Sequence, residues 1–380
     1  MRKRFVKRSI TLFSSILIFA QILCGLPAHS VEFGQDATGD PNAVKVGGAS
    51  GFLYSERIVI TVGHVIESTG GLAYWERDGV IYSPGIVSVD WQKPYKVKKV
   101  LIPSTYVSPD YAKNIIIDDL AIIILNEDIP MTKRAVLATE DQLKRFVKEK
   151  SKVELVGYGI RSGSERNLLG QRNNRPPNKL TSTLISPEMV IDFYKQYSNV
   201  DWKKINKPGV YGIVQHRELQ QSHICDGDSG SVFFVEEDNV RYVLGTTGLG
   251  LVNNNCPPPD QWYGYPSMSW IDPASKLPEL IKAAEKIVAE DKKIEAEQAE
   301  AARAAAELYA KQVAEARAAA DLKARQEAEA KVLADKLAAD KLAAAKNAIQ
   351  PKTTITCIKG KSIKSVTGVK PVCPSGYRKK

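Results

Sequence analysis

Short apolar runs separated by turn residues dominate the chain from residue 31 to about residue 278. The runs at 57–62, 121–125, 152–156, 231–235 and 241–244 are rich in β-branched and aromatic residues and are bounded by Gly, Pro, Asn or Asp. Such runs predict β-strands. Residues 140–150 and 187–197 are expected to form short helices, and residues 161–179, rich in Arg, Asn, Gly and Pro, an exposed loop. Many short strands over about 250 residues favour an all-β barrel or sandwich.

A different pattern begins near residue 280. Residues 280–350 contain mainly Ala, Glu, Lys, Arg and Asp, without a single Gly or Pro, and Pro351 follows them. These residues are strong helix formers, so one helix of about 100 Å is expected. The large apolar residues follow no steady heptad, which favours a solvated spacer helix. A weak Ala-rich coiled coil and a helical hairpin remain as alternatives.

The first thirty residues have the pattern of a secretory signal peptide. Five basic residues and no acid precede an apolar run at 10–26, and Ala28 and Ser30 place small residues at positions −3 and −1 of a cleavage site. A transmembrane anchor is the alternative, but the run is short and is interrupted by polar residues. We therefore predict export and a mature chain that begins at Val31.

The net charge of +10 is distributed unevenly. Residues 1–30 contribute +5 and residues 351–380 contribute +8, whereas residues 281–350 are neutral, so residues 31–280 carry −3. A slightly acidic globular part argues against nucleic-acid binding.

The cysteines suggest disulfides in an exported chain. Cys24 leaves with the signal peptide, and the large Leu23 before it disfavours lipidation. Four cysteines remain, Cys225, Cys256, Cys357 and Cys373. Three pairing patterns are possible, and we favour the one that joins nearest neighbours, Cys225 with Cys256 and Cys357 with Cys373.

The basic tail, residues 351–380, is expected to be a small hairpin closed by Cys357 and Cys373. A bridge between them closes a loop of about 16 residues, worth roughly 3 kcal/mol. The tail resembles a short two-cysteine module at the ends of secreted actinobacterial proteins. Its charge suits contact with an anionic cell-wall polymer or membrane surface; a merely solubilising role is the alternative.

Three polar positions suggest catalysis. His64 follows the apolar run 57–62, and Asp118 and Asp119 stand at the entry of the run 121–125, where a carboxylate would be partly buried and would need a partner. A histidine N–H is such a partner. Ser229 lies in Cys-Asp-Gly-Asp-Ser-Gly-Ser, where flanking glycines allow a tight turn and close approach of a substrate. A structural histidine would be the plainer interpretation of His64 alone.

With their contexts and order, these residues resemble the trypsin/chymotrypsin-like serine proteases. His64 stands in T-V-G-H, Asp119 in D-L-A-I-I and Ser229 in G-D-S-G-S, and G-Y-G at 157–159 is similar to a further family strand. The resemblance covers residues 31 to about 271. It implies a double six-stranded β-barrel and a secreted serine endopeptidase.

The roles that the resemblance implies are those of the Ser-His-Asp triad. Ser229 is the nucleophile, His64 the base, and Asp119 orients the base; Asp118 is the rival of Asp119. The backbone N–H groups of Gly227 and Ser229 would form the oxyanion hole. The family pattern has a glycine where Ser231 stands, a mild departure that removes no catalytic group.

The resemblance also implies a substrate pocket. Cys225 and Cys256 would bridge its wall, and His223 would lie at its base, where it offers no fixed negative charge to basic side chains. The pocket could therefore accept substrates whose residue before the cleaved bond has an acidic, amide or apolar side chain. Three glycines would line the walls: Gly248, Gly250 and Gly264.

The resemblance also implies how the enzyme would be activated. Val31 begins a segment similar to the family's mature N-terminus, whose ammonium pairs with the aspartate before the nucleophile, here Asp228. Signal-peptide cleavage before Val31 would then activate the enzyme directly.

Four segments are therefore predicted: a signal peptide at 1–30, a protease domain at 31–278, a helix at 279–350 and a basic tail at 351–380. The expected partners are protein or peptide substrates, with no nucleic acid, cofactor or metal. The alternatives are a catalytically inactive homologue that acts as a binding module on a helical stalk, and a structural surface rod.

Overall fold

The structure of the protein is a computed structural model. It describes residues 31, 34–89, 92–110, 115–160, 175–197, 210–215, 222–247, 250–252, 267–271, 275–348 and 350–380. The chain divides into two compact units, Met1–Lys292 and Lys293–Lys380.

The first unit begins with a six-stranded sheet whose central strands are buried on both faces. β4 pairs antiparallel with β3 and with β9, and all residues of β4 and β9 are buried. Gly85, after β5, donates its N–H to the carbonyl of Ala43 in β2 (2.8 Å), so the two edges of the sheet approach each other in a barrel-like arrangement. In sheet order the strands are β2 (Ala43–Val46), β3 (Ala49–Ser55), β4 (Ile58–Thr61), β9 (Ala121–Leu125), β6 (Tyr95–Leu101) and β5 (Val80–Ile81).

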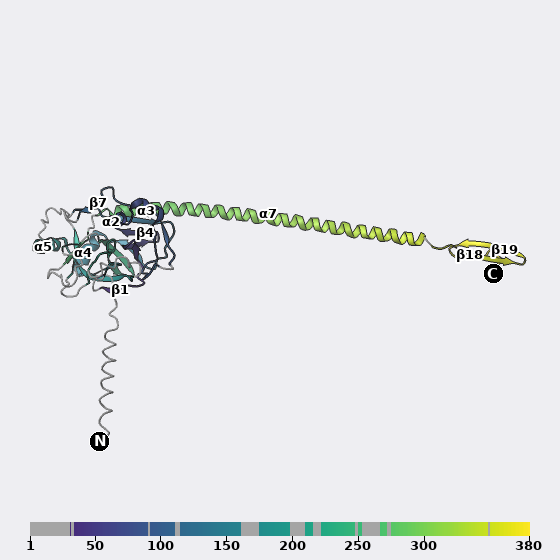
Figure 1. Ribbon diagram of the computed structural model, residues 1–380, viewed down its shortest axis with the longest axis horizontal. Helices are drawn as coiled ribbons and strands as arrows, with labels where there is room; N and C mark the ends of the chain where they lie inside the picture. Colours follow the sequence, from purple (N-terminus) through teal and green to yellow (C-terminus); the bar gives the residue numbers. More distant parts are fainter. Residues whose placement is uncertain are drawn as a thin grey trace, which may run out of the picture. The chain divides into compact units, whose positions relative to one another are not determined.

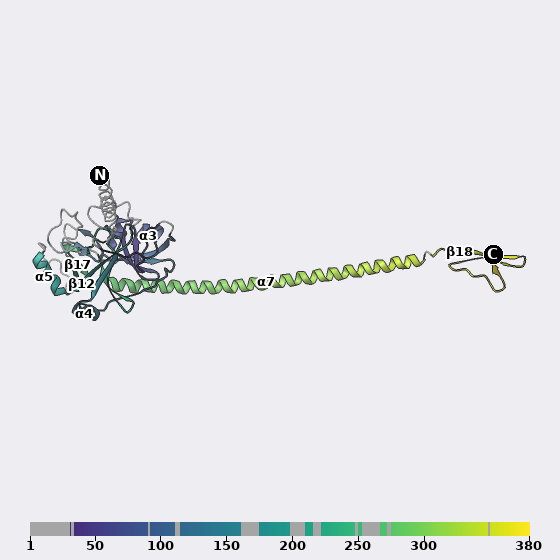
Figure 2. The ribbon, with the colours of Figure 1, turned by 90° about the horizontal axis from the view of Figure 1, so that it is seen from below.

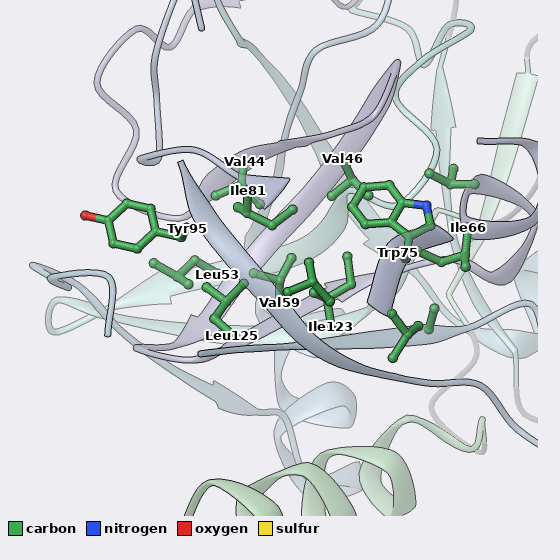
Figure 3. Packing of buried hydrophobic residues seen from close by; sticks show 14 of the residues in the cluster. Val44, Val46, Leu53, Val59, Ile66, Trp75, Ile81, Tyr95, Ile123 and Leu125 are labelled. Atoms are coloured by element: carbon green, nitrogen blue, oxygen red, sulfur yellow. The ribbon is translucent and has the colours of Figure 1, made fainter. Parts of the chain in front are cut away.

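Alternation along these strands fills two separate cores. Val59, Ile123 and Leu125 point into a core on one face of the sheet, which Trp75 closes at one side (Figure 3). Ile122 belongs to the core on the other face, together with residues of the second sheet. A strand between two cores reads as a continuous apolar run, which is the pattern of residues 121–125.

Two short helices, α2 (Gly63–Ser68) and α3 (Gly71–Asp78), follow β4 and were not expected from the sequence. Trp75 on α3 is buried, and its indole N–H donates to the hydroxyl of Thr69 (2.9 Å). Helices of six and eight residues are too short to establish an apolar period of 3.6 residues, which explains why the pattern missed them.

The second sheet of this unit contains nine strands among the described residues. The prediction of six strands thus matches the first sheet and not the second. Their order is β10 (Arg134–Leu137), β15 (Val240–Thr246), β14 (Val232–Glu237), β11 (Lys152–Gly157), β12 (Asn178–Ile185), β13 (Tyr211–Gln215), β17 (Ser267–Ile271) and β16 (Gly250–Val252), with β1 (Gln35–Asp36) on β12.

Two helices accompany the second sheet, as predicted: α4 (Glu140–Glu149) and α5 (Pro187–Tyr197). Thr139 caps α4, since its hydroxyl accepts from the N–H of Gln142 and the Gln142 side chain accepts from the N–H of Thr139. The predicted loop 161–179 is wrong at its end, because Asn178 and Lys179 belong to β12 and pair with β11. Residues 161–174 of that loop lie outside the described residues.

Helix α7 (Leu277–Ala348) is one continuous helix of 72 residues (Figures 1 and 2). It begins before the predicted residue 280 because Pro278 is tolerated in a first turn, where its missing N–H has no helical acceptor. Its continuity excludes the helical hairpin. The all-β class is therefore wrong for the whole chain and applies to the sheets of the first unit.

The root of α7 belongs to the first unit. Leu277, Ile281 and Ala284 are buried in the core between the two sheets. Beyond this root, Lys292 lies 2.8 Å from the carboxylate of Glu56 and 3.3 Å from that of Asp128. None of the described helices combines the length and the apolar character that a membrane span requires.

The second unit contains most of α7 and a small three-stranded sheet. β18 (Thr353–Lys359) pairs with β19 (Ser362–Gly368) and with β20 (Arg378–Lys379). Cys357 and Cys373 form a disulfide, as predicted, and Cys357 is completely buried.

Candidate active site

The pairing of β4 with β9 brings His64 and Asp119 together. Thr61, the last residue of β4, lies opposite Ala121, the first residue of β9. His64 comes shortly after the first position, in α2, and Asp119 just before the second. The carboxylate oxygen Oδ2 of Asp119 lies 2.7 Å from Nδ1 of His64, and Oδ1 accepts the backbone N–H of His64 (2.9 Å).

This contact defines the chemical state of the histidine ring. The side chain of Asp119 is 2% exposed and that of His64 is 18% exposed. A buried carboxylate at Nδ1 favours the tautomer with the proton on Nδ1, which leaves Nε2 as a proton acceptor. His64 can therefore act as a general base.

Asp118 has a different environment from its neighbour. Its backbone has a φ of 46°, a left-handed conformation that aspartate tolerates better than most residues. Its side chain accepts the hydroxyl of Thr105, and its carbonyl accepts the N–H of Leu120 (2.7 Å). The left-handed turn directs the two adjacent acids to different partners, and the structure brings Asp119, not Asp118, to His64.

The predicted nucleophile lies in a turn that both sheets hold. The N–H of Ser50 in β3 donates to the carbonyl of Ser229 (3.0 Å), and the N–H of Gly230 donates to the carbonyl of Thr247 (3.3 Å). The hydroxyl of Ser50 also donates to the carbonyl of Gly227 (2.7 Å). Nothing in the sequence pattern singled out Ser50, since its partners lie about 180 residues further along the chain.

Glycine is required at the position after the serine. Gly230 has a φ of 89°, and a Cβ there would lie 2.2 Å from the carbonyl oxygen of Ser50 and 2.3 Å from Oγ1 of Thr61. No other side chain fits. The residue after Ser229 thus packs against the end of β4, three residues before His64.

Two backbone N–H groups in this turn remain available for a ligand. Gly227, with a φ of 95°, and Ser229 donate no backbone hydrogen bond to any acceptor in the part of the chain that the structure describes. N–H groups without a protein acceptor near a nucleophile are what an oxyanion hole needs.

Asp228 is completely buried. Its carboxylate accepts the N–H of Gly159 at Oδ1 and that of Cys225 at Oδ2, both at 2.8 Å. A Cβ on Gly157, the last residue of β11, would lie 2.2 Å from Oδ1 of Asp228, so only glycine fits at this position. Burial raises the pKa of Asp228 from 3.8 to about 7, and the nearby charge of Asp226 adds to this effect.

Val31 is buried in the core of the second sheet, in the same cluster as Ile224. Its carbonyl accepts the N–H of Gly34 (2.7 Å), and its φ is 33°. A positive φ is a strained conformation for a β-branched residue.

The predicted pocket is described only in part. His223 is completely buried, and Gly250 lies in β16. Cys225 is disulfide-bonded. Its predicted partner Cys256 lies outside the described residues, as do Gly248 and Gly264.

The site offers acid–base and nucleophilic groups. Within the described residues, no group of three or more His, Cys, Asp or Glu side chains could hold a metal ion.

Comparison with known proteins gives one result. A family model described as Trypsin matches residues 36–265, which include the His64–Asp119 pair and the turn at Ser229. A search of curated proteins found no match.

Proposed function

Because this chain belongs to the trypsin family, we propose that it is an exported serine endopeptidase that uses Ser229, His64 and Asp119. The contact of 2.7 Å between His64 and Asp119 carries the proposal, because it prepares Nε2 as a base beside the turn that holds the serine. The membership itself implies a serine-protease fold and protein or peptide substrates.

The proposed reaction proceeds in two steps. The oxygen of Ser229 attacks the scissile carbonyl while its proton moves to Nε2 of His64. The C–N bond then breaks, and His64 gives that proton to the leaving amine, which leaves an acyl-enzyme. Water repeats the sequence, with its proton passing through His64 back to Ser229, and releases the acid. Asp119 stabilises the imidazolium that forms in each step.

The negative oxygen of each tetrahedral intermediate would accept the N–H groups of Gly227 and Ser229. Their lack of acceptors among the described residues supports this role. Loss of one such donor costs about 10²–10³ in rate where it has been measured.

Activation would follow from cleavage before Val31. Asp228 is a buried carboxylate that no cationic group faces within the described residues, and a new ammonium at Val31 would supply the missing charge. Cleavage would also remove the strain at Val31, about 1–3 kcal/mol, because φ constrains the residue only while Ser30 is attached. Both observations support the signal peptide at residues 1–30 as the segment that is removed.

His223 would set the substrate preference. A buried histidine at the pocket base provides no permanent negative charge, so cleavage after Arg or Lys is not expected. The proposed substrates have an acidic, amide or apolar side chain at the residue before the cleaved bond.

We also propose that the tail contacts an anionic surface, such as a cell-wall polymer. Residues 351–380 carry eight basic residues and no acid, and most of them are exposed. Sedimentation of the mature chain with vesicles of anionic lipid, compared with a chain ending at residue 350, tests this contact. Equal sedimentation of both chains would reject it.

A fluorophosphonate probe, which reacts with an activated serine, tests the enzymatic function. The mature chain should become labelled, whereas Ser229→Ala and His64→Ala should not. Absence of label on a chain that begins at Val31 would reject the enzyme and favour the alternative of an inactive, binding homologue.

A further inference from the structure

A third acid lies close to the His64–Asp119 pair and binds the segment that leads to it. Glu67 lies one turn after His64 on α2. One of its carboxylate oxygens, Oε2, accepts the hydroxyl of Tyr106 (2.8 Å) and the hydroxyl of Ser108 (2.7 Å). These two residues stand at the beginning of β7 (Val107–Asp110), about 40 residues further along the chain.

The hairpin of β7 and β8 (Ile115–Ile117) forms a separate two-stranded sheet. Val107 and Ile117 are 45% and 43% exposed, so the burial of these two side chains contributes little to holding it. Thr105, just before the hairpin, donates to Asp118, just after it, and closes its base. The hydrogen bonds of Tyr106 and Ser108 to Glu67 join this hairpin to α2.

The same hairpin leads along the chain directly to Asp119. Ile117 ends β8, and Asp119 follows after the single left-handed residue Asp118. At the other end, the ring of Tyr106 packs on Gly63, where a Cβ would lie 2.7 Å from the ring. Tyr106 thus contacts the residue directly before His64, and the hairpin delivers the acid that holds His64.

We propose that Glu67 is a positioning residue, which fixes the β7–β8 hairpin on α2 and thereby fixes Asp119 against His64. This inference rests on the proposed function, because it assigns to His64 and Asp119 the roles of base and orienting acid. In this role Glu67 touches neither the substrate nor the reacting atoms.

Glu67 also acts on His64 through its charge. The hydrogen bonds from Ser108 and then Tyr106 lower the pKa of Glu67, which favours its ionised form. Among the described residues, the titratable groups around His64 are Asp119 before β9, Glu67 on α2 and Tyr106 before β7. The pKa of Tyr106 is raised by burial and by Glu67. A carboxylate near the ring favours the imidazolium, so removal of this carboxylate disfavours the charged ring.

Positioning and charge can be separated by three variants of the mature chain. Glu67→Ala removes both the acceptor and the charge. Glu67→Gln keeps an oxygen for the two hydroxyls and removes the charge, and Tyr106→Phe combined with Ser108→Ala keeps the charge and removes the hydrogen bonds. Glu140→Gln, on α4, is the control for loss of an exposed acid.

The first readout is the rate of fluorophosphonate labelling of Ser229 as a function of pH. Glu67→Ala should label about ten to a hundred times more slowly, because small displacements of catalytic groups have effects of this size. Its pH midpoint should shift downward. Glu67→Gln should shift the midpoint while keeping most of the rate, the double variant should lose rate with an unchanged midpoint, and Glu140→Gln should match the wild type.

The second readout does not require activity. In a Ser229→Ala background, NMR titration of the His64 ring should show a lower pKa in Glu67→Gln than in its parent. If the wild type is not labelled but this shift occurs, the proposed function fails and the effect of Glu67 on His64 stands. Wild-type labelling with unchanged labelling rates in Glu67→Ala and in the double variant would overturn the inference, as would a loss of thermal stability without a change in labelling rate.

Discussion

Removal of the residue before Val31 should reverse the pH dependence that Asp228 gives to the stability of the first unit. In a chain that has further residues before Val31, the backbone nitrogen of Val31 is an uncharged amide. The carboxyl of Asp228 is then buried with two backbone donors and no cation among the described residues, and its pKa is raised to about 7. In a chain that begins at Val31, an ammonium is available as its partner.

The sign and the size follow from the two pKa values. In the extended chain the folded state binds a proton at Asp228 more tightly than the unfolded state does, since the pKa is about 7 instead of 3.8. The free energy of unfolding therefore falls as pH rises from about 4 to about 7, by about 4 kcal/mol in total. In the processed chain the ammonium lowers the pKa of Asp228, so this loss is absent and stability falls on acidification instead.

The assay compares chains that begin at Ser30 and at Val31, both carrying Ser229→Ala to prevent self-cleavage. Thermal unfolding at pH 5 and pH 8 should show that the Ser30 chain loses stability at the higher pH. Because the unfolded carboxyl is already ionised at pH 5, the loss between pH 5 and pH 8 is about 3 kcal/mol of the total, which corresponds to about 8 °C in a unit of this size. Asp228→Asn should remove the difference between the two chains, because an amide does not titrate.

Two results would refute this reasoning. If the Ser30 and Val31 chains have the same pH dependence, the new ammonium does not reach Asp228. If the difference between them persists in Asp228→Asn, another group causes it.

Three further predictions concern packing. Gly230→Ala should destabilise the first unit by at least about 3 kcal/mol and abolish labelling, because its Cβ would lie 2.2 Å from a backbone carbonyl oxygen. If this variant unfolds at the same denaturant concentration as the wild type, the turn accommodates the Cβ and the prediction is wrong. Arg241→Met should lower the free energy of unfolding by about 3–5 kcal/mol, because it leaves the buried carboxylate of Asp40 without the two hydrogen bonds of 2.7 and 2.8 Å. Adding Asp40→Asn should recover part of this loss of stability. Ile281→Ala should destabilise the first unit by about 2–4 kcal/mol, whereas Leu322→Ala, 59% exposed on the same helix, should change its stability by less than about 0.5 kcal/mol; equal effects would contradict the assignment of the helix root to the first unit.

The parts of the site that the sequence predicted are those with a local pattern. His64 follows an apolar strand and Asp119 precedes one, so the pattern located both residues at strand ends, and the ordered family motifs then indicated their roles. Gly227 and Gly230 indicated a tight turn, and both have positive φ values. Each of these features is visible within about six residues of the chain.

The parts that it did not predict depend on contacts between distant segments. Ser50 binds the turn at Gly227 across 177 residues, and Glu67 binds Tyr106 across 39. A hydroxyl or a carboxylate on the surface of a short element has no periodicity to reveal its partner. The structure had to bring these segments together before their roles could be inferred.

Helix α7 illustrates how a local pattern can be overlooked within a longer one. Leu277, Ile281 and Ala284 are spaced as i, i+4 and i+7, which is the buried face of an amphipathic helix. This face extends for only the first turns, whereas almost all residues beyond Lys292 are exposed. Averaged over 72 residues the apolar period is weak, so the sequence indicated a solvated helix and not its buried root.

The arrangement of the site makes its geometry depend on the packing between the two sheets. β4 and β9 of the first sheet position the base and the acid, but the turn of Ser229 directly precedes β14 of the second sheet and is held by Ser50 on one side and Thr247 on the other. A change in the core between the sheets can therefore displace the nucleophile from its base without unfolding either sheet. For this reason activity should be more sensitive than stability to substitutions in that core, including those at the root of α7.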